Sequence, residues 1–168
     1  MTQTISEEAE AQFVALGIER EVFGIPVETV LEILDMQPVF RVPEAPAYLL
    51  GLIDLRGRSV PVLDLRIKLG LPAVAPTEST RILVIEVEIS GRSLVLGLVA
   101  DRVFEVMAIH ARDIEPPPDI GVRWRSEYIR GVGHRDARFV IIFDLARLFS
   151  SEDAAALVSS TTPECVTA

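Results

Sequence analysis

The chain is patterned as short apolar runs separated by glycine, proline or charged residues. Each run is rich in Val, Ile and Leu and too short for a typical helix, which favours strands. The runs lie at residues 13–16, 21–25, 30–34, 60–63, 82–87, 94–99, 103–107 and 139–143. Four or five such strands in about 70 residues predict a small closed barrel, because closure leaves no strand edge unpaired.

Helical signals are brief. Residues 64–69 predict a short helix that ends at Gly70, and residues 151–158 are a possible C-terminal helix. Asp64 and Asp144 each precede a leucine at the start of a short helical stretch. N-capping therefore explains these two carboxylates better than acid–base chemistry does.

Two stretches of the chain are repeated in the same order. Residues 23–33 align without gaps with residues 96–106, an offset of 73, and residues 48–65 align with residues 128–145, an offset of 80. The identical pairs of the first alignment are Gly24/Gly97, Val30/Val103 and Glu32/Glu105. Such ordered repetition indicates a tandem duplication, with about seven extra residues near the Pro116–Pro118 triplet.

The duplication predicts the domain organisation. We expect a disordered acidic N-terminus at residues 1–11 and a first barrel at residues 12–72. Residues 73–81 have linker composition, and a second barrel is expected at residues 82–150. Residues 151–168 would form the short helix and a tail. The predicted fold is therefore mainly all-β, built from two consecutive small barrels.

Composition narrows the classes of function. The 168 residues are 49% hydrophobic but only 6% aromatic, so the core must be aliphatic. The net charge of −9 would repel a phosphate backbone, which argues against nucleic acid and anionic membranes as partners. No apolar run is long enough to insert into a membrane, and the first ten residues do not resemble a secretory signal. A cytoplasmic protein is expected.

Candidate catalytic groups are sparse. His110 and His134 are isolated, and the single cysteine, Cys165, lies in the C-terminal tail. No cluster has metal-ligand spacing, and no phosphate-binding loop, dinucleotide fingerprint or nucleophile motif is present. We therefore expect neither a cofactor, nor a metal, nor an enzymatic activity.

Several segments together resemble the CheW-like scaffold proteins of bacterial chemosensory systems. The strongest is residues 51–65, GLIDLRGRSVPVLDL, with further likeness at residues 23–33, 42–46, 99–103 and 127–145. The resemblance implies two five-stranded SH3-like barrels. It also implies a non-enzymatic adaptor that couples the cytoplasmic tips of methyl-accepting chemoreceptors to the regulatory domain of a CheA-type histidine kinase.

The resemblance also implies a receptor contact. Val30, Glu32 and Arg56 match positions that lie at that contact in the family, and Gly57 adjoins Arg56 in the same predicted turn. Asp54 departs from the family pattern, which commonly has Asn before Arg-Gly, and so adds a negative charge beside Arg56. The residues alone favour a solvated turn in which Arg56 pairs with Asp54 for under about 1 kcal/mol, and only the resemblance favours the receptor contact.

Kinase contacts on such a scaffold should be apolar patches with polar rims. The candidates are Ile33, Leu34, Met36, Val39 and Phe40, with Gly51 near them. Each apolar side chain could instead fill the barrel core, and Gly51 could be purely structural. A helical hairpin docked in a groove between the barrels would be one mode of recognition.

Three questions stay open at this point. The pathway could control flagella, type IV pili or a second messenger, and the scaffold could self-associate in array rings. A small-ligand-binding β-barrel is the rival of another class. It would need convergent polar groups in an apolar pocket, which the sequence does not reveal.

Overall fold

The computed structural model describes residues 10–89, 91–116, 128–135 and 137–149. Eleven strands lie in these ranges. They are β1 (Glu10–Ile18), β2 (Glu21–Pro26), β3 (Val30–Asp35), β4 (Leu49–Leu55), β5 (Arg58–Asp64), β6 (Arg81–Ile89), β7 (Arg92–Ala100), β8 (Arg102–His110), β9 (Ile114–Glu115), β10 (Ile129–Arg135) and β11 (Arg138–Phe143). The short helices there are η1 (Val27–Thr29), α2 (Leu65–Lys68), η2 (Ala111–Asp113) and α3 (Leu145–Leu148). The expected helix and tail at residues 151–168 lie outside the described residues.

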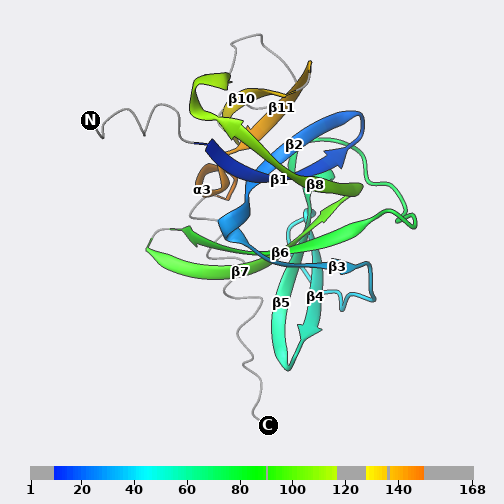
Figure 1. The fold of residues 1–168 in the computed structure, drawn as a ribbon. Helices are drawn as coiled ribbons and strands as arrows, with labels where there is room; N and C mark the ends of the chain where they lie inside the picture. The colour runs from blue at the N-terminus through cyan, green and yellow to red at the C-terminus, as the bar shows by residue number, and fades with distance from the viewer. Residues whose placement is uncertain (1–9, 90, 117–127, 136, 150–168) are drawn as a thin grey trace.

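The strands form two curled sheets, one above the other in Figure 1. A six-stranded sheet has the order β8-β1-β2-β11-β10-β9, and a five-stranded sheet has the order β3-β6-β7-β5-β4. By their order in the two copies, β3 is equivalent to β8, β6 to β1, β7 to β2, β5 to β11 and β4 to β10. With these equivalences the strand order β3-β6-β7-β5-β4 becomes β8-β1-β2-β11-β10. The two sheets thus share one topology, and the prediction of a duplicated, mainly β, SH3-like fold is confirmed.

The predicted division into consecutive barrels at residues 73–81 is wrong. Each sheet takes strands from both halves of the chain: β1 and β2 pair with strands of the second copy, while β6 and β7 pair with strands of the first. Two parallel pairings join strands of the two copies in this exchanged arrangement, β5 with β7 and β11 with β2. Gly97 faces Val62 in the first pairing and Gly24 faces Ile142 in the second, so equivalent residues occupy equivalent places.

The N-terminal boundary also differs from the prediction. Glu10 and Ala11 belong to β1, where they pair with His110 and Ile109 of β8, and so are not part of a disordered segment. Residues 1–9, the rest of that predicted segment, lie outside the described part of the chain. The connection before β6 does have the irregular backbone expected for a linker, and β6 begins at Arg81.

The main hydrophobic core joins the two sheets. Leu16 and Phe23 of the six-stranded sheet belong to one buried cluster with Leu83 and Leu98 of the five-stranded sheet. In the same cluster Phe23 stacks on Phe143, with ring centroids 4.8 Å apart. Full burial of such side chains contributes about 1.5–3 kcal/mol each, so the strand exchange is held mainly by apolar packing between the sheets.

Candidate functional site

The β4–β5 hairpin ends in a two-residue turn made by Arg56 and Gly57. Both have positive φ, 55° and 82°, and Leu55 pairs with Arg58 across the strand ends, as in a type I′ turn. Asp54 completes the turn, because its Oδ1 accepts a hydrogen bond from the Gly57 N–H at 2.9 Å. An asparagine Oδ1 could accept the same bond, so the turn can form with either Asp or Asn at position 54.

Arg56 and Glu32 form a two-pronged ion pair between the turn and β3. The Nη1 and Nη2 atoms of Arg56 donate to the two carboxylate oxygens of Glu32 at 2.9 and 3.1 Å. The hydrogen bond to Glu32, with the charge of that carboxylate, raises the pKa of Arg56. The Arg56 side chain is 76% exposed and that of Glu32 only 24%. The guanidinium therefore faces solvent, while the carboxylate that holds it is mostly covered.

The structure thus brings four of the predicted receptor residues together: Glu32, Asp54, Arg56 and Gly57. Arg56 pairs with Glu32 and not, as the solvated-turn hypothesis supposed, with Asp54. Val30 differs, since its side chain packs against the core shared by the two sheets. A register shift lies between Val30 and Glu32 in the pairing of β3 with β6.

The predicted kinase residues divide into exposed and core positions. Ile33 and Phe40 are 44% and 78% exposed. The others, Leu34, Met36 and Val39, pack against a buried cluster of the five-stranded sheet that includes Ile53, Val60, Val62, Ile82 and Val84. These three side chains remain partly accessible.

Gly51 has a structural role that its residue type explains. Its φ is 149°, and a Cβ built there would lie 2.0 Å from the carbonyl oxygen of Phe40. The same Phe40 forms a bridge with Leu52, in which the two residues exchange N–H···O bonds of 2.8 Å. Gly51 therefore allows the chain after β3 to lie directly against β4.

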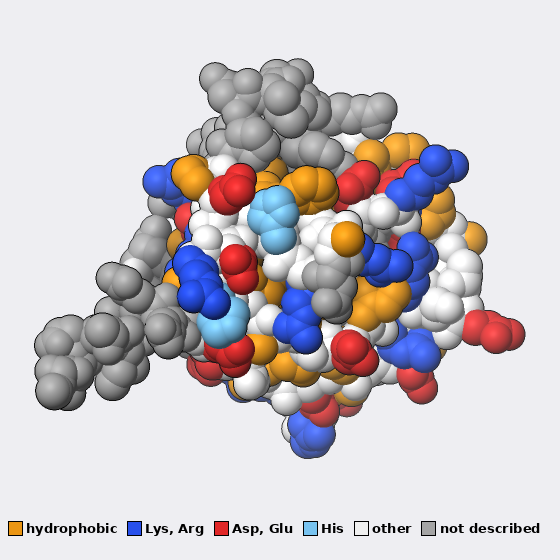
Figure 2. All heavy atoms as spheres, turned by 45° about the horizontal axis from the view of Figure 1, so that its top comes forward, with side chains coloured by type: hydrophobic (Ala, Val, Ile, Leu, Met, Phe, Trp, Pro, Cys, Tyr) orange, Lys and Arg blue, Asp and Glu red, His pale blue; other side chains and the backbone are white. Residues whose placement is uncertain are grey.

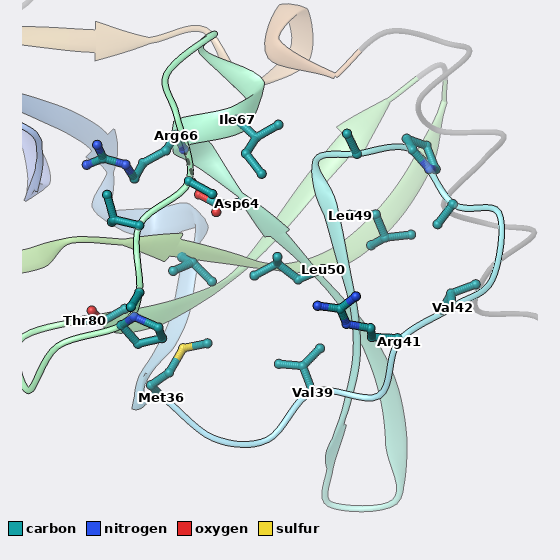
Figure 3. Close-up of a pocket in the computed structure, with 18 of the residues that line it drawn as sticks. Met36, Val39, Arg41, Val42, Leu49, Leu50, Asp64, Arg66, Ile67 and Thr80 are labelled. Carbon is teal, nitrogen blue, oxygen red and sulfur yellow. Dashed lines mark hydrogen bonds between the residues drawn. The ribbon is translucent and has the colours of Figure 1, made fainter.

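A pocket of about 660 Å³ opens between this chain segment, α2 and the connection before β6. Met36, Val39 and Leu50 supply apolar lining (Figure 3), and residues 73–76 with Thr80 form another wall. Sequence patterning did not reveal the pocket, because its walls come from segments that have no regular periodicity. The signal that existed was the proline- and alanine-rich composition of residues 72–76.

Charged groups lie at the α2 side of the pocket. Asp64 caps α2 by accepting the Arg66 N–H at 2.9 Å, which confirms its predicted capping role. Burial raises the pKa of Asp64, and the Arg66 N–H and guanidinium partly oppose that rise. Asp144 caps α3 in the same way, through the N–H of Arg147. The Arg66 side chain is itself buried and binds Glu19 and Asp101, an arrangement that sequence patterning did not predict.

Figure 2 shows the end of the molecule formed by the six-stranded sheet, where both histidines lie near acidic side chains. His110 Nε2 is 3.2 Å from Glu10 and His134 Nε2 is 3.4 Å from Glu115. Within the described ranges, no three His, Cys, Asp or Glu residues are arranged to hold a metal ion. No helix in those ranges is long and apolar enough to cross a membrane.

Comparisons with known proteins agree with this architecture. The CheW-like domain family matches residues 12–153. Chemotaxis protein CheW of Rhizobium meliloti is 34% identical over 142 residues, 84% of this chain and 89% of that protein. Chemotaxis protein CheW of Klebsiella aerogenes is 33% identical over 144 residues, 86% of this chain and 84% of that protein.

A relative that matches over a shorter stretch and a solved structure extend the comparison. Protein FrzA of Myxococcus xanthus is 36% identical over 109 residues, 65% of each chain. The crystal structure of the scaffolding protein TtCheW from Thermoanaerobacter tengcongensis superposes with a TM-score of 0.76 at 29% identity, covering 86% of this chain and 96% of that one. The family match over most of the chain and the shared two-sheet fold show that this chain belongs to the CheW-like family.

Proposed function

We propose that the chain is a scaffold that couples chemoreceptors to the regulatory domain of a CheA-type histidine kinase. Family membership over residues 12–153 supports this function. The single structural observation that carries it is the Arg56–Glu32 pair, which displays a guanidinium from a rigid turn at an exposed edge. Such a scaffold would act in the cytoplasm, beside the membrane-proximal tips of the receptors.

The receptor surface of this proposal is the turn Asp54–Gly57 with Glu32. Arg56 keeps donors available to solvent because it is 76% exposed, while Glu32 and the left-handed backbone restrict where the guanidinium points. Orienting the side chain in advance reduces the entropy lost when a partner's carboxylate or backbone oxygen binds. Val30 would support β3 from the core side and make no direct contact.

The kinase surface of this proposal is the 660 Å³ pocket with its exposed neighbours. Met36 and Val39 line the pocket, and Phe40, the next residue along the chain, is 78% exposed. The apolar side of this pocket fits an apolar anchor residue from a partner protein. Leu34 and Gly51 would act indirectly, Leu34 through packing and Gly51 through the position of Phe40.

A non-enzymatic role is part of the proposal. The carboxylates that could have served acid–base chemistry, Asp64 and Asp144, accept hydrogen bonds from helix N-termini. The two histidines lie beside Glu10 and Glu115, on the six-stranded sheet. These contacts give each group a structural partner and support a protein that binds without turning over a substrate.

The pocket also supports one alternative function, that of a small-ligand-binding β-barrel. Its volume is within the range of small-molecule sites, and charged groups line one side of it. A thermal-shift screen separates the two functions, because a specific small ligand would raise the melting temperature of the isolated protein. The scaffold function predicts no such shift, but a shift on adding the kinase regulatory domain.

The direct test is reconstitution with partners from the same genome. We expect the chain to bind the kinase regulatory domain and a receptor-tip fragment, and to bind both at once. Absence of binding to every CheA-type regulatory domain of that genome would contradict the proposal. Neighbouring flagellar, pilus or cyclase genes would identify the output, and analytical ultracentrifugation of the kinase complex would test assembly into rings.

A further inference from the structure

Arg66 connects three segments that are far apart in the sequence. Its Nε donates to the Pro72 carbonyl at 2.9 Å, its Nη1 to Asp101 at 2.7 Å and its Nη2 to Glu19 at 2.8 Å. The side chain is only 6% exposed. All three guanidinium nitrogens are thus engaged, one with the connection before β6, one with the β7–β8 junction and one with the β1–β2 turn.

The acceptors of Arg66 are themselves held in place. Asp101 also accepts the Glu19 N–H at 2.8 Å, and Arg102 donates to the Glu19 carbonyl at 3.1 Å. Glu19 has φ of 61°, a left-handed conformation that costs energy for a residue with a Cβ and persists where neighbours hold it. Arg66 therefore binds a braced corner of the molecule, and Pro72 is tied to that corner.

Pro72 begins the wall of the pocket. Residues 73–76 and Thr80 line the pocket, and the far end of this wall is closed by the Thr77 N–H bond to Thr80 Oγ1 at 2.8 Å. At the near end, the Leu71 N–H donates to the Arg66 carbonyl at 2.7 Å, beside the guanidinium bond to Pro72. Figure 3 shows the Arg66 guanidinium directed away from the apolar lining, and Arg66 itself borders the pocket.

The equivalent helix of the other copy forms without an arginine at this place. Ala146 stands at the equivalent position of α3, yet α3 keeps its aspartate cap and its place in the core. We propose that Arg66 is a positioning residue for the kinase-docking pocket, holding the 72–80 wall in the shape that accepts the partner. The assignment of the pocket to the kinase rests on the proposed function.

The test combines hydrogen exchange with binding. Arg66→Lys keeps the positive charge but lacks the planar fork that reaches three acceptors. We expect the amide protons of Leu71, Thr77 and Thr80 to exchange at least about tenfold faster in this variant, with β6 and β7 unchanged. Affinity for the kinase regulatory domain should fall about tenfold, and affinity for the receptor-tip fragment should stay within about twofold.

Two further variants complete the design. Arg66→Leu removes the fork and should enlarge both effects, whereas Arg147→Leu on α3 is the matched control, because Arg147 is 69% exposed. Unchanged wall exchange in both Arg66 variants, or faster exchange with unchanged kinase affinity, would overturn the proposal. Equal loss of both partners together with faster exchange in β6 and β7 would indicate a general stabilising role and would also overturn it. A wild-type chain that binds no kinase would refute the proposed function, whatever the exchange data show about the wall.

Discussion

The helices α2 and α3 occupy equivalent places in the two copies but have different surroundings. Both follow a strand, both are capped by an aspartate, and the capping residues Asp64 and Asp144 donate their own N–H to the carbonyls of Tyr48 and Tyr128. Only α2 carries a buried arginine, which ties a turn, a strand junction and a connection together. Equivalent backbone bonds thus coexist with different side-chain networks.

The hairpin turns differ in the same way. The β4–β5 turn has Arg56-Gly57 held by Asp54 and Glu32, whereas the β10–β11 hairpin has His134 packed on Phe139, with ring centroids 4.7 Å apart. Duplication therefore preserved the strand pairing and the caps, while polar side chains diverged both at the surface, as at Arg56, and in the interior, as at Arg66. We infer that the side chains that differ between the two copies are the first candidates for contacts with partner proteins.

The largest expected difference concerns the equivalent glycines Gly51 and Gly131. At Gly51 a Cβ would meet the Phe40 backbone at 2.0 Å, and the positive φ adds strain, so we expect Gly51→Ala to cost about 3 kcal/mol or more. At Gly131 the nearest contact is 2.8 Å, so Gly131→Ala should cost less. Urea unfolding of both variants measures the loss in free energy of unfolding, and equal losses would contradict the expected difference between the two glycines.

The next effect is the pH dependence that comes from Asp64. Because burial raises the pKa of Asp64 in the folded protein, the folded state holds a proton there more tightly than the unfolded chain does. This tighter proton binding adds to the free energy of unfolding. The contribution is fully present at pH values below the ordinary carboxyl pKa of about 4, and it is lost as pH rises through the raised pKa of the folded protein. Asp64→Asn keeps a capping oxygen and removes this titration.

The measurement is the melting temperature of the wild type minus that of Asp64→Asn, followed from about pH 4 to pH 7. We expect this difference to fall as pH rises. Asp144→Asn at the equivalent cap is the matched control for the cap itself. A difference that rises with pH would show that pairing with Arg66 outweighs burial at Asp64.

Arg56→Ala should have little effect on stability and a large effect on binding. The pair with Glu32 is exposed on the arginine side, so the free energy of unfolding should stay close to that of the wild type. Receptor affinity should fall about tenfold or more if the guanidinium contacts the receptor. Arg58→Ala, in the same hairpin, is the control. A large loss of stability in Arg56→Ala would instead make the pair structural.

The smallest effect is expected for Asp54→Asn. The amide oxygen can accept the Gly57 N–H as the carboxylate does, so stability should change by under about 0.5 kcal/mol. Receptor affinity should also change little, since Arg56 pairs with Glu32. Isothermal titration of the receptor fragment measures this. A change as large as that of Arg56→Ala would show that the Asp54 charge itself contributes to recognition.

The sequence revealed eight of the eleven described strands, the two caps and the duplication, because each depends on residues close together in the chain. It missed β4, β9 and β10, which lie outside the apolar runs. It could not reveal the exchange of β1–β2 and β6–β7, since similarity shows which strands are equivalent but not which ones pair. The Glu32–Arg56 contact spans 24 residues, and Arg66 reaches Asp101 across 35. Such contacts depend on tertiary register, which the residue pattern alone does not specify.

The central claim is that this chain connects two partners at once. Its most direct test is co-purification of the kinase regulatory domain with an immobilised receptor-tip fragment, with and without the wild-type chain. We predict that the kinase is retained only when the chain is present, and that the Arg56→Ala variant retains much less kinase while still binding the kinase in solution. Retention without the chain, or no retention with it, would contradict the account.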